Sequence, residues 1–226
     1  GEWLKLVIKK IKEIKKKNKT PILVGGTGLY FRALTDGLVK IPKIPFKFRY
    51  KIRLLQKKIG QKQFYRNLVK IDPSIKSKIS ESDIQRSLRA YEVKSYTKKS
   101  LIDWFKNTKS KFLEDEFLKI YIDFPREDLI ERISKRTSKM FMNGVIEEVG
   151  SFLKLKVKKD NSSNKVIGIS EIEEYLRNKT EIKDIIEKIS IKTRQYAKRQ
   201  STWARGQMIN WQKLKPKDLK KFLKKI

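Results

Sequence analysis

The stretch Pro21-Ile22-Leu23-Val24-Gly25-Gly26-Thr27-Gly28 joins a short apolar run to a glycine-rich turn. Ile22, Leu23 and Val24 lie between turn signals, a pattern typical of a strand buried on both faces of a parallel sheet. The glycines and Thr27 follow where such a strand would meet a helix, and open α/β sheets bind ligands and phosphates at that point. The stretch therefore predicts an α/β fold with a candidate binding turn.

The turn taken alone has two interpretations. It matches neither the GxxxxGK[ST] nor the GxGxxG phosphate-binding pattern. Glycines between a strand and a helix are also required by tight backbone geometry without any ligand. Phosphate recognition and a purely structural turn therefore both stay open at this point.

Helical patterns flank the turn on both sides. Apolar residues spaced three and four apart predict an amphipathic helix over residues 4–14, which Asn18 and Pro21 end. A second helix is predicted from Leu29 to about Gly37. The order of helix, strand, glycine turn and helix is typical of an α/β protein.

The middle of the chain predicts helices only. Residues 41–45 contain two prolines and indicate a connection. Periodic segments follow at 46–59 and 62–69, Asp72-Pro73 predicts a capped turn, and Ser82 with Gln85 predicts a capping box that opens a helix to Val93. We expect residues 41–111 to form a helical insertion domain and residues 1–40 with 112–226 to form an α/β core.

The last part of the chain returns to mixed structure. The expected elements are a strand at 118–123, a helix from Pro125 to Met142 broken at Gly144, a helix at 145–155, a helix opened by a Ser170–Glu173 capping box, a long helix to about Arg205, a strand at 208–211 and a helix after Pro216. Residues 156–165 indicate a polar loop. Asp123, at the end of the expected strand, is a candidate helix cap or a replacement catalytic base.

Composition narrows the possible chemistry. The chain has 226 residues, no Cys and no His, which excludes disulfides, thiol nucleophiles, His-based triads and Cys- or His-ligated metals. Lys and Arg number 57 against 25 Asp and Glu, a net charge of +32. Such an excess predicts a polyanionic partner, because cations that neutralise phosphates release bound counterions. The alternative is a lysine-rich but merely solvated surface.

Hydropathy gives no sign of a membrane segment. No apolar stretch approaches the ~18 residues that cross a bilayer, and residues 1–15 lack the apolar core of a secretory signal. We therefore expect a cytoplasmic protein without a membrane partner. Because residue 1 is Gly and a helix follows at once, we also expect the chain to be incomplete.

Two cation-rich segments are candidate RNA contacts. On a helix, Arg194, Lys198, Ser201 and Arg205 share one face, with amides and aromatics beside them, which suits RNA phosphates and exposed bases. The segment 82–90 places arginines on the first turns of a capped helix, where anions are favoured. For both segments the alternative is a solvated helix face.

The ordered motifs resemble those of the tRNA dimethylallyltransferase family. They are the stretch 21–30 with Arg32-Ala33-Leu34 and Gly37-Leu38; Asp83-Ile84-Gln85-Arg86 with Arg89-Ala90 and Glu92-Val93; Arg132-Ile133 with Arg136, Met140 and Gly144; Ile167-Gly168 with Glu171 and Tyr175-Leu176; and Thr193 to Gln200 with Thr202-Trp203 and Arg205. The resemblance covers essentially the whole chain.

The resemblance implies a fold and an activity. The implied fold is a P-loop-NTPase-like parallel-sheet core, here without its N-terminal part, with a helical insertion domain. The implied enzyme, a monomer, moves a dimethylallyl group from dimethylallyl diphosphate to N6 of the adenosine 3′ of the tRNA anticodon, with Mg²⁺. Its target base would be flipped out of the anticodon stem-loop.

The resemblance also implies roles for residues, carried over by position. Thr27 would lie at the reaction centre, and Arg136 would bind the diphosphate, whose departing charge guanidinium groups stabilise. The implied tRNA contacts are Arg49, Gln85, Arg86, Ser87, Leu88, Arg89, Lys165, Gly168, Lys198, Arg199, Gln200, Ser201, Thr202, Trp203 and Arg205.

Departures from the family pattern lead to a further expectation. The family's GxxxxGK[ST] loop and its general-base aspartate do not occur in these residues. Ile169, Ser170 and Ala204 also replace more usual residue types. We expect the chain alone to be inactive, with the metal ligands outside it. The alternative class is a non-catalytic, basic tRNA- or RNA-binding protein on the same scaffold, which would bind tRNA without responding to the prenyl donor.

Overall fold

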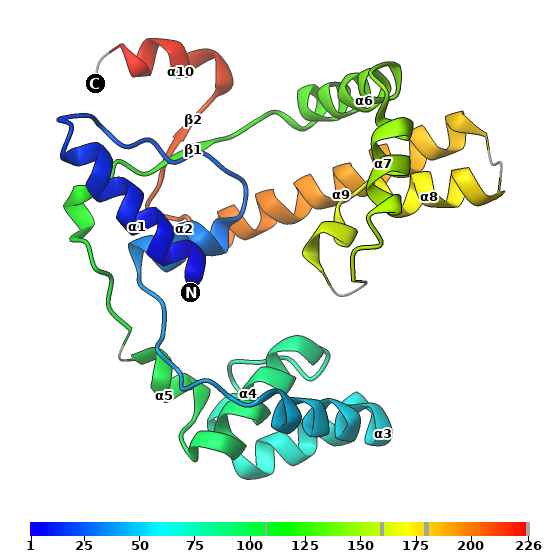
Figure 1. Cartoon of the computed structure of the whole chain (residues 1–226). Helices are drawn as coiled ribbons and strands as arrows, with labels where there is room; N and C mark the ends of the chain where they lie inside the picture. Colours follow the sequence, from blue (N-terminus) through cyan, green and yellow to red (C-terminus); the bar gives the residue numbers. More distant parts are fainter. Residues whose placement is uncertain (107, 159–160, 179–180, 225–226) are drawn as a thin grey trace. The chain divides into compact units, whose positions relative to one another are not determined.

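The computed structural model describes residues 1–106, 108–158, 161–178 and 181–224, and these are mostly helical with one two-stranded parallel sheet (Figure 1). The chain divides into two compact units. Unit 1 comprises residues 1–24 and 29–117, and unit 2 comprises residues 25–28 and 118–226.

Unit 1 begins with helix α1 (Glu2–Lys15), which confirms the helix expected over residues 4–14. Asn18 follows it in the left-handed conformation, with φ of 53°. Trp3 of α1 stacks on Tyr30 with ring centroids 4.4 Å apart. Tyr30 belongs to α2 (Gly28–Thr35), the helix expected after the glycine turn.

The expected strand at residues 22–24 is wrong. These residues adopt no regular structure, and the side chains of Ile22 and Val24 are 76% and 92% exposed. A strand is stabilised by the hydrogen-bond ladder to a neighbour, and no described residue makes such backbone hydrogen bonds to residues 22–24. An apolar run predicts burial only where a partner strand is present.

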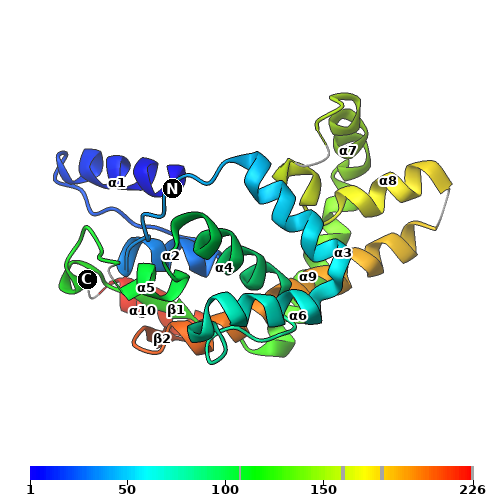
Figure 2. The same cartoon turned by 90° about the horizontal axis from the view of Figure 1, so that it is seen from below.

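Residues 46–106 form a helical bundle, as expected. Helix α3 (Phe46–Ile71) is kinked at Gly60, whose φ of 76° and ψ of 163° separate the two predicted helices. The 3₁₀ turn η1 (Pro73–Ile75), α4 (Ile84–Thr97) and α5 (Leu101–Lys106) follow, and η2 (Glu114–Glu116) lies further along. α3 and α4 lie side by side (Figure 2). Their shared core contains Ile44, Tyr65, Leu68, Ile75, Ile79, Ala90, Val93 and Leu101.

The cap of α4 differs from the expectation. Asp83 is the N-cap residue, and its carboxylate accepts a 3.0 Å hydrogen bond from the backbone N–H of Arg86. Ser82 instead shares a hydrogen bond with Ser80, so the Ser82–Gln85 box is wrong by one residue. Asp is as good an N-cap residue as Ser, so the sequence contains two adjacent candidates for the N-cap of α4. The backbone conformation makes Asp83 the N-cap.

Unit 2 contains the sheet. Strand β1 (Ile120–Ile122) confirms the strand expected at 118–123, and it pairs in parallel with β2 (Gln212–Leu214). The second strand was expected at 208–211, which is wrong. Met208 is buried and its backbone N–H still bonds to Ala204 of the preceding helix, so the extended conformation begins only at Gln212.

The described part of unit 2 contains six helical elements. They are α6 (Arg126–Met142), α7 (Val145–Lys154), η3 (Ser162–Lys165), α8 (Ile169–Asn178), α9 (Ile182–Gln207) and α10 (Pro216–Leu223). Gly144, with φ of 81°, separates α6 from α7 as expected. The core residues are Val145, Val149, Ile172, Ile185 and Ile189. Pro125 is the N-cap of α6 without a side-chain hydrogen bond, so Asp123 does not cap this helix.

Glu171 replaces the expected Ser170–Glu173 capping box. It is the third residue of α8, and its carboxylate accepts a 2.8 Å hydrogen bond from the backbone N–H of Gly168, the residue before the helix. Ser170 donates to the same carboxylate at 3.0 Å, and Lys192 of α9 forms an ion pair with it. Glu171 is only 3% exposed, so this carboxylate connects two helices inside unit 2.

The pKa of Glu171 is lowered from its usual 4.5. Burial alone raises the pKa, but the hydrogen bonds from Lys192 and from backbone N–H groups outweigh that effect.

Across the part of the chain that the structure describes, no helix is long and apolar enough to cross a membrane.

We predict that Glu171→Gln lowers the free energy of unfolding at pH 7 by about 1–3 kcal/mol, because buried donors lose their charged partner. A carboxylate whose pKa is lowered by folding stabilises the fold above its unfolded pKa, and this contribution is lost as the pH falls through the folded pKa. The difference from the parent should therefore shrink below about pH 4.5. Urea unfolding followed by circular dichroism at pH 7 and pH 4 measures it.

The control is Glu131→Gln, which removes an exposed ion pair with Lys135 on α6 and should change stability little. Equal effects of the two substitutions at pH 7 would contradict the role of Glu171.

Candidate active site and RNA-binding surfaces

The glycine turn of unit 2 lies directly against α9. The side-chain amide of Gln200 donates a 3.0 Å hydrogen bond to the backbone carbonyl of Gly26. A Cβ atom at Gly28 would lie 2.0 Å from the indole ring of Trp203, well inside contact distance. Glycine at position 28 therefore lets the turn approach the helix this closely. Packing therefore requires glycine at position 28, independently of any ligand that the turn binds.

Thr27 lies between these two contacts and is exposed to solvent. It is the last residue before α2, with Gly26 and Gly28 held by α9 on either side. The hydroxyl is therefore accessible to a ligand and is not part of the packed interior. Sequence reasoning singled out Thr27 for this position, and its exposure is compatible with that expectation.

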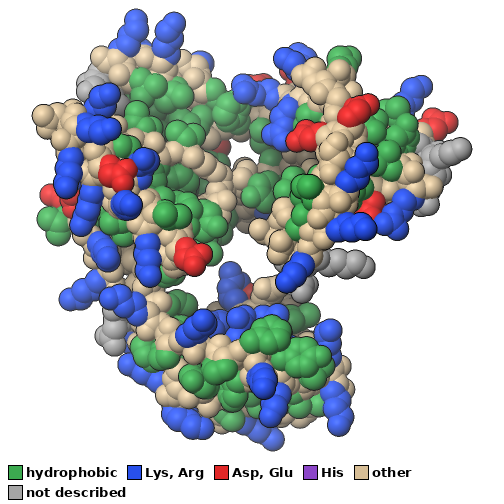
Figure 3. Space-filling view, viewed as in Figure 1, with side chains coloured by type: hydrophobic (Ala, Val, Ile, Leu, Met, Phe, Trp, Pro, Cys, Tyr) green, Lys and Arg blue, Asp and Glu red, His purple; other side chains and the backbone are tan. Residues whose placement is uncertain are grey.

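The last turns of α9 carry the cations that the sequence pattern indicated. Lys198, Arg199 and Arg205 are exposed, and the guanidinium of Arg199 lies 5.7 Å from the ring centroid of Tyr196. Thr202 is exposed and Ser201 half-buried. Figure 3 shows how widely Lys and Arg side chains cover the visible surface, with few acidic side chains among them. Gln200 and Trp203 differ from the rest, because they are already engaged with the glycine turn.

The segment before α8 contains two candidate tRNA contacts, of which one is exposed and one is buried. Lys165, at the end of η3, is exposed. Gly168 is buried and adopts φ of 111°, a conformation that favours glycine. Its backbone N–H is taken by Glu171.

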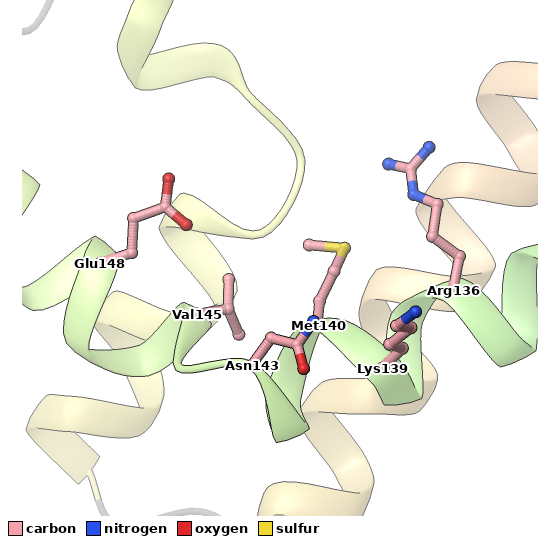
Figure 4. Close-up of a pocket in the computed structure, with 6 residues that line it drawn as sticks. All are labelled: Arg136, Lys139, Met140, Asn143, Val145 and Glu148. Carbon is pink, nitrogen blue, oxygen red and sulfur yellow. The ribbon is translucent and has the colours of Figure 1, made fainter.

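Arg136 lines a small open pocket of about 230 Å³ at the junction of α6 and α7 (Figure 4). Arg136, Lys139 and Met140 come from α6, Asn143 from the link, and Val145 and Glu148 from α7. Two cations and one carboxylate therefore face this space, and an anion could be held beside Arg136.

The remaining candidates lie in unit 1, with Arg49 on α3 and the others at the start of α4. Gln85 and Arg86 are exposed, and Arg86 forms an ion pair with Asp83. The hydrogen bond from the backbone N–H of Arg86 lowers the pKa of that carboxyl. Ser87 is fully buried and accepts a 3.3 Å hydrogen bond from Gln61. Leu88 is half-buried.

Glu92 and Arg53 are residues that the sequence analysis did not select as site residues. Glu92 is buried and lies within ion-pair distance of Arg49, Arg53 and Arg89. In the sequence, Arg49 and Arg53 are four residues apart on one helix, and Arg89 and Glu92 are three residues apart on another. These spacings place the members of each pair on the same helix face. Only the packing of α3 on α4 brings the two pairs together.

The described residues show no cluster of metal-ligating side chains. None of them form a group of three or more Asp, Glu, His or Cys residues able to hold a metal ion. Mg²⁺ prefers oxygen ligands in octahedral geometry, and the glycine turn presents a single side-chain hydroxyl. No chemical step is therefore assigned to a metal on these residues.

Clustered guanidinium groups and exposed cations on a helix are features typical of the class of proteins that bind polyanions. Comparison with known proteins narrows this class. A family profile described as IPP transferase matches residues 1–207. The chain therefore belongs to the IPP transferase family.

Relatives and solved structures agree with this membership. The tRNA dimethylallyltransferase of Pelagibacter ubique (strain HTCC1062) is 58% identical over 226 residues, which is 100% of this chain and 72% of the relative. That of Rickettsia massiliae (strain Mtu5) is 39% identical over 92% of this chain and 57% of the relative.

Two crystal structures resemble the fold. A tRNA isopentenylpyrophosphate transferase from Staphylococcus epidermidis has 29% identity and a TM-score of 0.57, covering 95% of this chain and 69% of that one. A eukaryotic dimethylallyltransferase acting on tRNA has 26% identity and a TM-score of 0.76, covering 94% of this chain and 55% of that one.

We predict that Gly28→Ala destabilises unit 2 by about 1–3 kcal/mol, because the added methyl group overpacks against Trp203. Alanine inside a helix normally stabilises it, so the opposite sign identifies the contact. Gly26→Ala should cost less, since the added methyl meets only the movable amide of Gln200. Urea unfolding measures the free energy of unfolding of each variant against that of the parent.

Gly150→Ala on α7 is the matched control, because a Cβ there meets nothing within 4 Å. A double variant with Trp203→Ala should show that Gly28→Ala no longer adds a penalty. If Gly28→Ala stabilises the protein as Gly150→Ala does, Trp203 does not press on the turn.

Proposed function

We propose that the chain is part of an enzyme that transfers a dimethylallyl group from dimethylallyl diphosphate to N6 of the adenosine 3′ of a tRNA anticodon. The observation that carries the proposal is the match to tRNA dimethylallyltransferases along nearly the whole chain. The exposed Thr27 beside a helix rich in cations supports it.

In the proposed reaction, the N6 amine attacks the first carbon of the dimethylallyl group. The carbon–oxygen bond to diphosphate breaks, diphosphate leaves with the bonding electrons, and the amine gives one proton to a general base, which is proposed to lie outside these residues. Thr27 is proposed to contact the amine and the prenyl donor, and Arg136 to stabilise the charge that develops on the leaving diphosphate.

The tRNA anticodon stem-loop is the proposed polyanionic partner. The contacts proposed for its phosphates and bases are Arg49, Gln85, Arg86, Arg89, Lys165, Lys198, Arg199, Ser201, Thr202 and Arg205, whose side chains are all exposed or partly exposed. Ser87 and Gly168 are buried, Gln200 and Trp203 are engaged with the glycine turn, and Leu88 is half-buried. Their proposed contribution is to hold these surfaces in shape.

The proposed architecture is a P-loop-NTPase-like core formed by residues 1–40 and 112–226, with residues 41–111 as a helical insertion domain. The helical character of residues 46–106 is consistent with the proposed insertion, whereas the two compact units group residues 1–24 and 29–40 with those helices and only residues 25–28 with the sheet. Within these 226 residues there is no GxxxxGK[ST] loop. We therefore propose that they bind tRNA by themselves but do not transfer the prenyl group.

The second candidate function is non-catalytic RNA binding. The observation that favours it is the net charge of +32, which attracts RNA whether or not the chain is catalytic. An assay of the purified chain for transfer of labelled dimethylallyl groups to tRNA separates the two. Transfer by the 226 residues alone would contradict the proposed need for further residues. Binding without transfer, even when the remaining part of the Pelagibacter relative is joined on, would favour the second function.

We predict that Thr27→Ala lowers the turnover of an active form by about 10- to 100-fold, because a group placed at the reacting atoms is lost. The affinity for tRNA should stay nearly unchanged, since Thr27 is one hydroxyl among many cationic contacts. Steady-state transfer kinetics and a tRNA-binding titration measure the two quantities. The active form is the chain itself or its fusion to the rest of the Pelagibacter relative. Equal turnover of variant and parent would remove Thr27 from the site.

We predict that Arg199→Ala weakens binding to tRNA and reduces by about 1 the slope of log affinity against log salt, as expected for one lost phosphate contact. Lys16→Ala on the exposed end of α1 is the control, because it removes the same charge from a surface with no proposed role. Fluorescence anisotropy with a labelled anticodon stem-loop at several salt concentrations measures both. Equal effects would mean that the cations of α9 act only through bulk charge.

A further inference from the structure

Glu92 on α4 gathers three arginines from two helices. Arg49 Nε lies 3.2 Å from its carboxylate, Arg53 Nε 3.6 Å, and one terminal guanidinium nitrogen of Arg89 also 3.6 Å. Arg49 and Arg53 come from α3, and Arg89 comes from the turn of α4 before Glu92. All four residues belong to unit 1, where α3 and α4 pack on each other (Figure 2). We call these four residues the Glu92 cluster.

The cluster carries more positive charge than its carboxylate balances. Three guanidinium groups face one carboxylate, which leaves a charge of about +2. Within the described ranges no other carboxylate lies within 4.0 Å of the three arginines. The carboxylate side chain is 2% exposed, whereas the arginine side chains are 39%, 54% and 42% exposed. The cluster therefore turns its negative charge inward and its positive charge outward.

The hydrogen bonds of the cluster are incomplete. Only Arg49 donates one to Glu92, and the other carboxylate oxygen, Oε1, is buried without any hydrogen-bond partner. At 3.6 Å, Arg53 and Arg89 are attracted to Glu92 but do not spend their N–H groups on it. Each guanidinium offers five N–H donors in a planar fork. Most donors of the cluster are thus available to an outside acceptor.

A purely structural role explains this arrangement poorly. One arginine neutralises one buried carboxylate, and even a well-formed buried pair contributes little net stability. Two additional guanidinium groups at the same carboxylate repel one another. Forked N–H donors around a centre of charge +2 match the paired oxygens of a phosphate group.

We propose that Glu92 is a positioning residue that assembles Arg49, Arg53 and Arg89 into one binding site for RNA phosphates. The proposal adds Arg53 to the RNA contacts and gives a buried acidic residue a role in binding a polyanion. It rests on the proposed function, because the RNA in question is the tRNA anticodon stem-loop.

The direction in which one substitution changes the RNA affinity separates a positioning role of Glu92 from an effect of bulk charge. Glu92→Gln raises the net charge of the chain by one, so attraction by bulk charge alone predicts equal or tighter RNA binding. Loss of the shared anchor predicts the opposite, because the arginines are then no longer held together. We expect affinity for a labelled anticodon stem-loop to fall about 5-fold or more, measured by anisotropy on the full 226-residue chain at fixed salt.

Glu13→Gln on α1 is the matched control, because it makes the same charge change at an exposed ion pair with Lys10. It should leave RNA affinity unchanged or slightly raised. An Nε–Hε correlation spectrum of ¹⁵N-labelled chain gives a readout without RNA. The signals of Arg49 and Arg53, assigned through Arg→Lys variants, should shift in Glu92→Gln and stay in place in Glu13→Gln.

Arg53→Ala tests the site without disturbing its anchor. Glu92 keeps Arg49 and Arg89, so the helices should remain packed and circular dichroism should be unchanged. RNA affinity should fall about 3- to 10-fold and the salt slope by about 1. Lys58→Ala, an exposed lysine further along α3, should have a smaller effect.

The outcomes separate the two proposals. If Glu92→Gln binds RNA as tightly as Glu13→Gln does, or Arg53→Ala as tightly as Lys58→Ala, the Glu92 cluster is not an RNA site, whereas the proposed function is unaffected. If the parent binds the anticodon stem-loop no better than an unrelated hairpin of equal length, the proposed tRNA substrate is wrong. In that case reduced binding of both RNAs by the two cluster variants still supports a phosphate site.

Discussion

The close approach of α9 to the glycine turn is the contact on which the candidate active site depends. It requires that residue 28 carry no side chain, because the indole of Trp203 occupies the space of a Cβ atom. It also needs a donor on α9 for the exposed carbonyl of Gly26, which Gln200 supplies. Because both neighbouring glycines are fixed, the side chain of Thr27 faces outward. Packing thus positions an exposed polar side chain.

A second constraint is the positive charge of the chain. The fold must offset the repulsion between its cations before they can bind a partner. Two buried carboxylates do this locally, one in each unit. Glu171 pairs with Lys192 and backbone N–H groups, so its charge is used up in holding α8 to α9. Glu92 has three arginines and an unbonded oxygen, so its surroundings keep a surplus of positive charge at the surface. Similar burial therefore serves stability in one case and, as we propose, recognition in the other.

Local patterns predicted the helices well and the strands less well. The kink at Gly60, the break at Gly144 and the helix after Pro216 were all visible, because glycine and proline act on the backbone at their own position. The run Ile22–Val24 is predicted as a strand but forms none, and Ile22 and Val24 are exposed, because a strand needs a partner that no local pattern can supply. Helix caps were missed by one residue where two good capping residues are adjacent, as at Ser82 and Asp83.

The sequence by itself determined the family, the helical segments and the types of residue available for chemistry, because these depend on residue identity and on spacing along the chain. It also indicated Thr27, Arg136 and the cations of α9 as candidates. Only the tertiary structure decided that Gln200 bonds to Gly26, 174 positions away, and that Arg49 meets Glu92, 43 positions away. Periodicity reports which face of a helix a side chain occupies, whereas the partner on that face is set by how the helices pack.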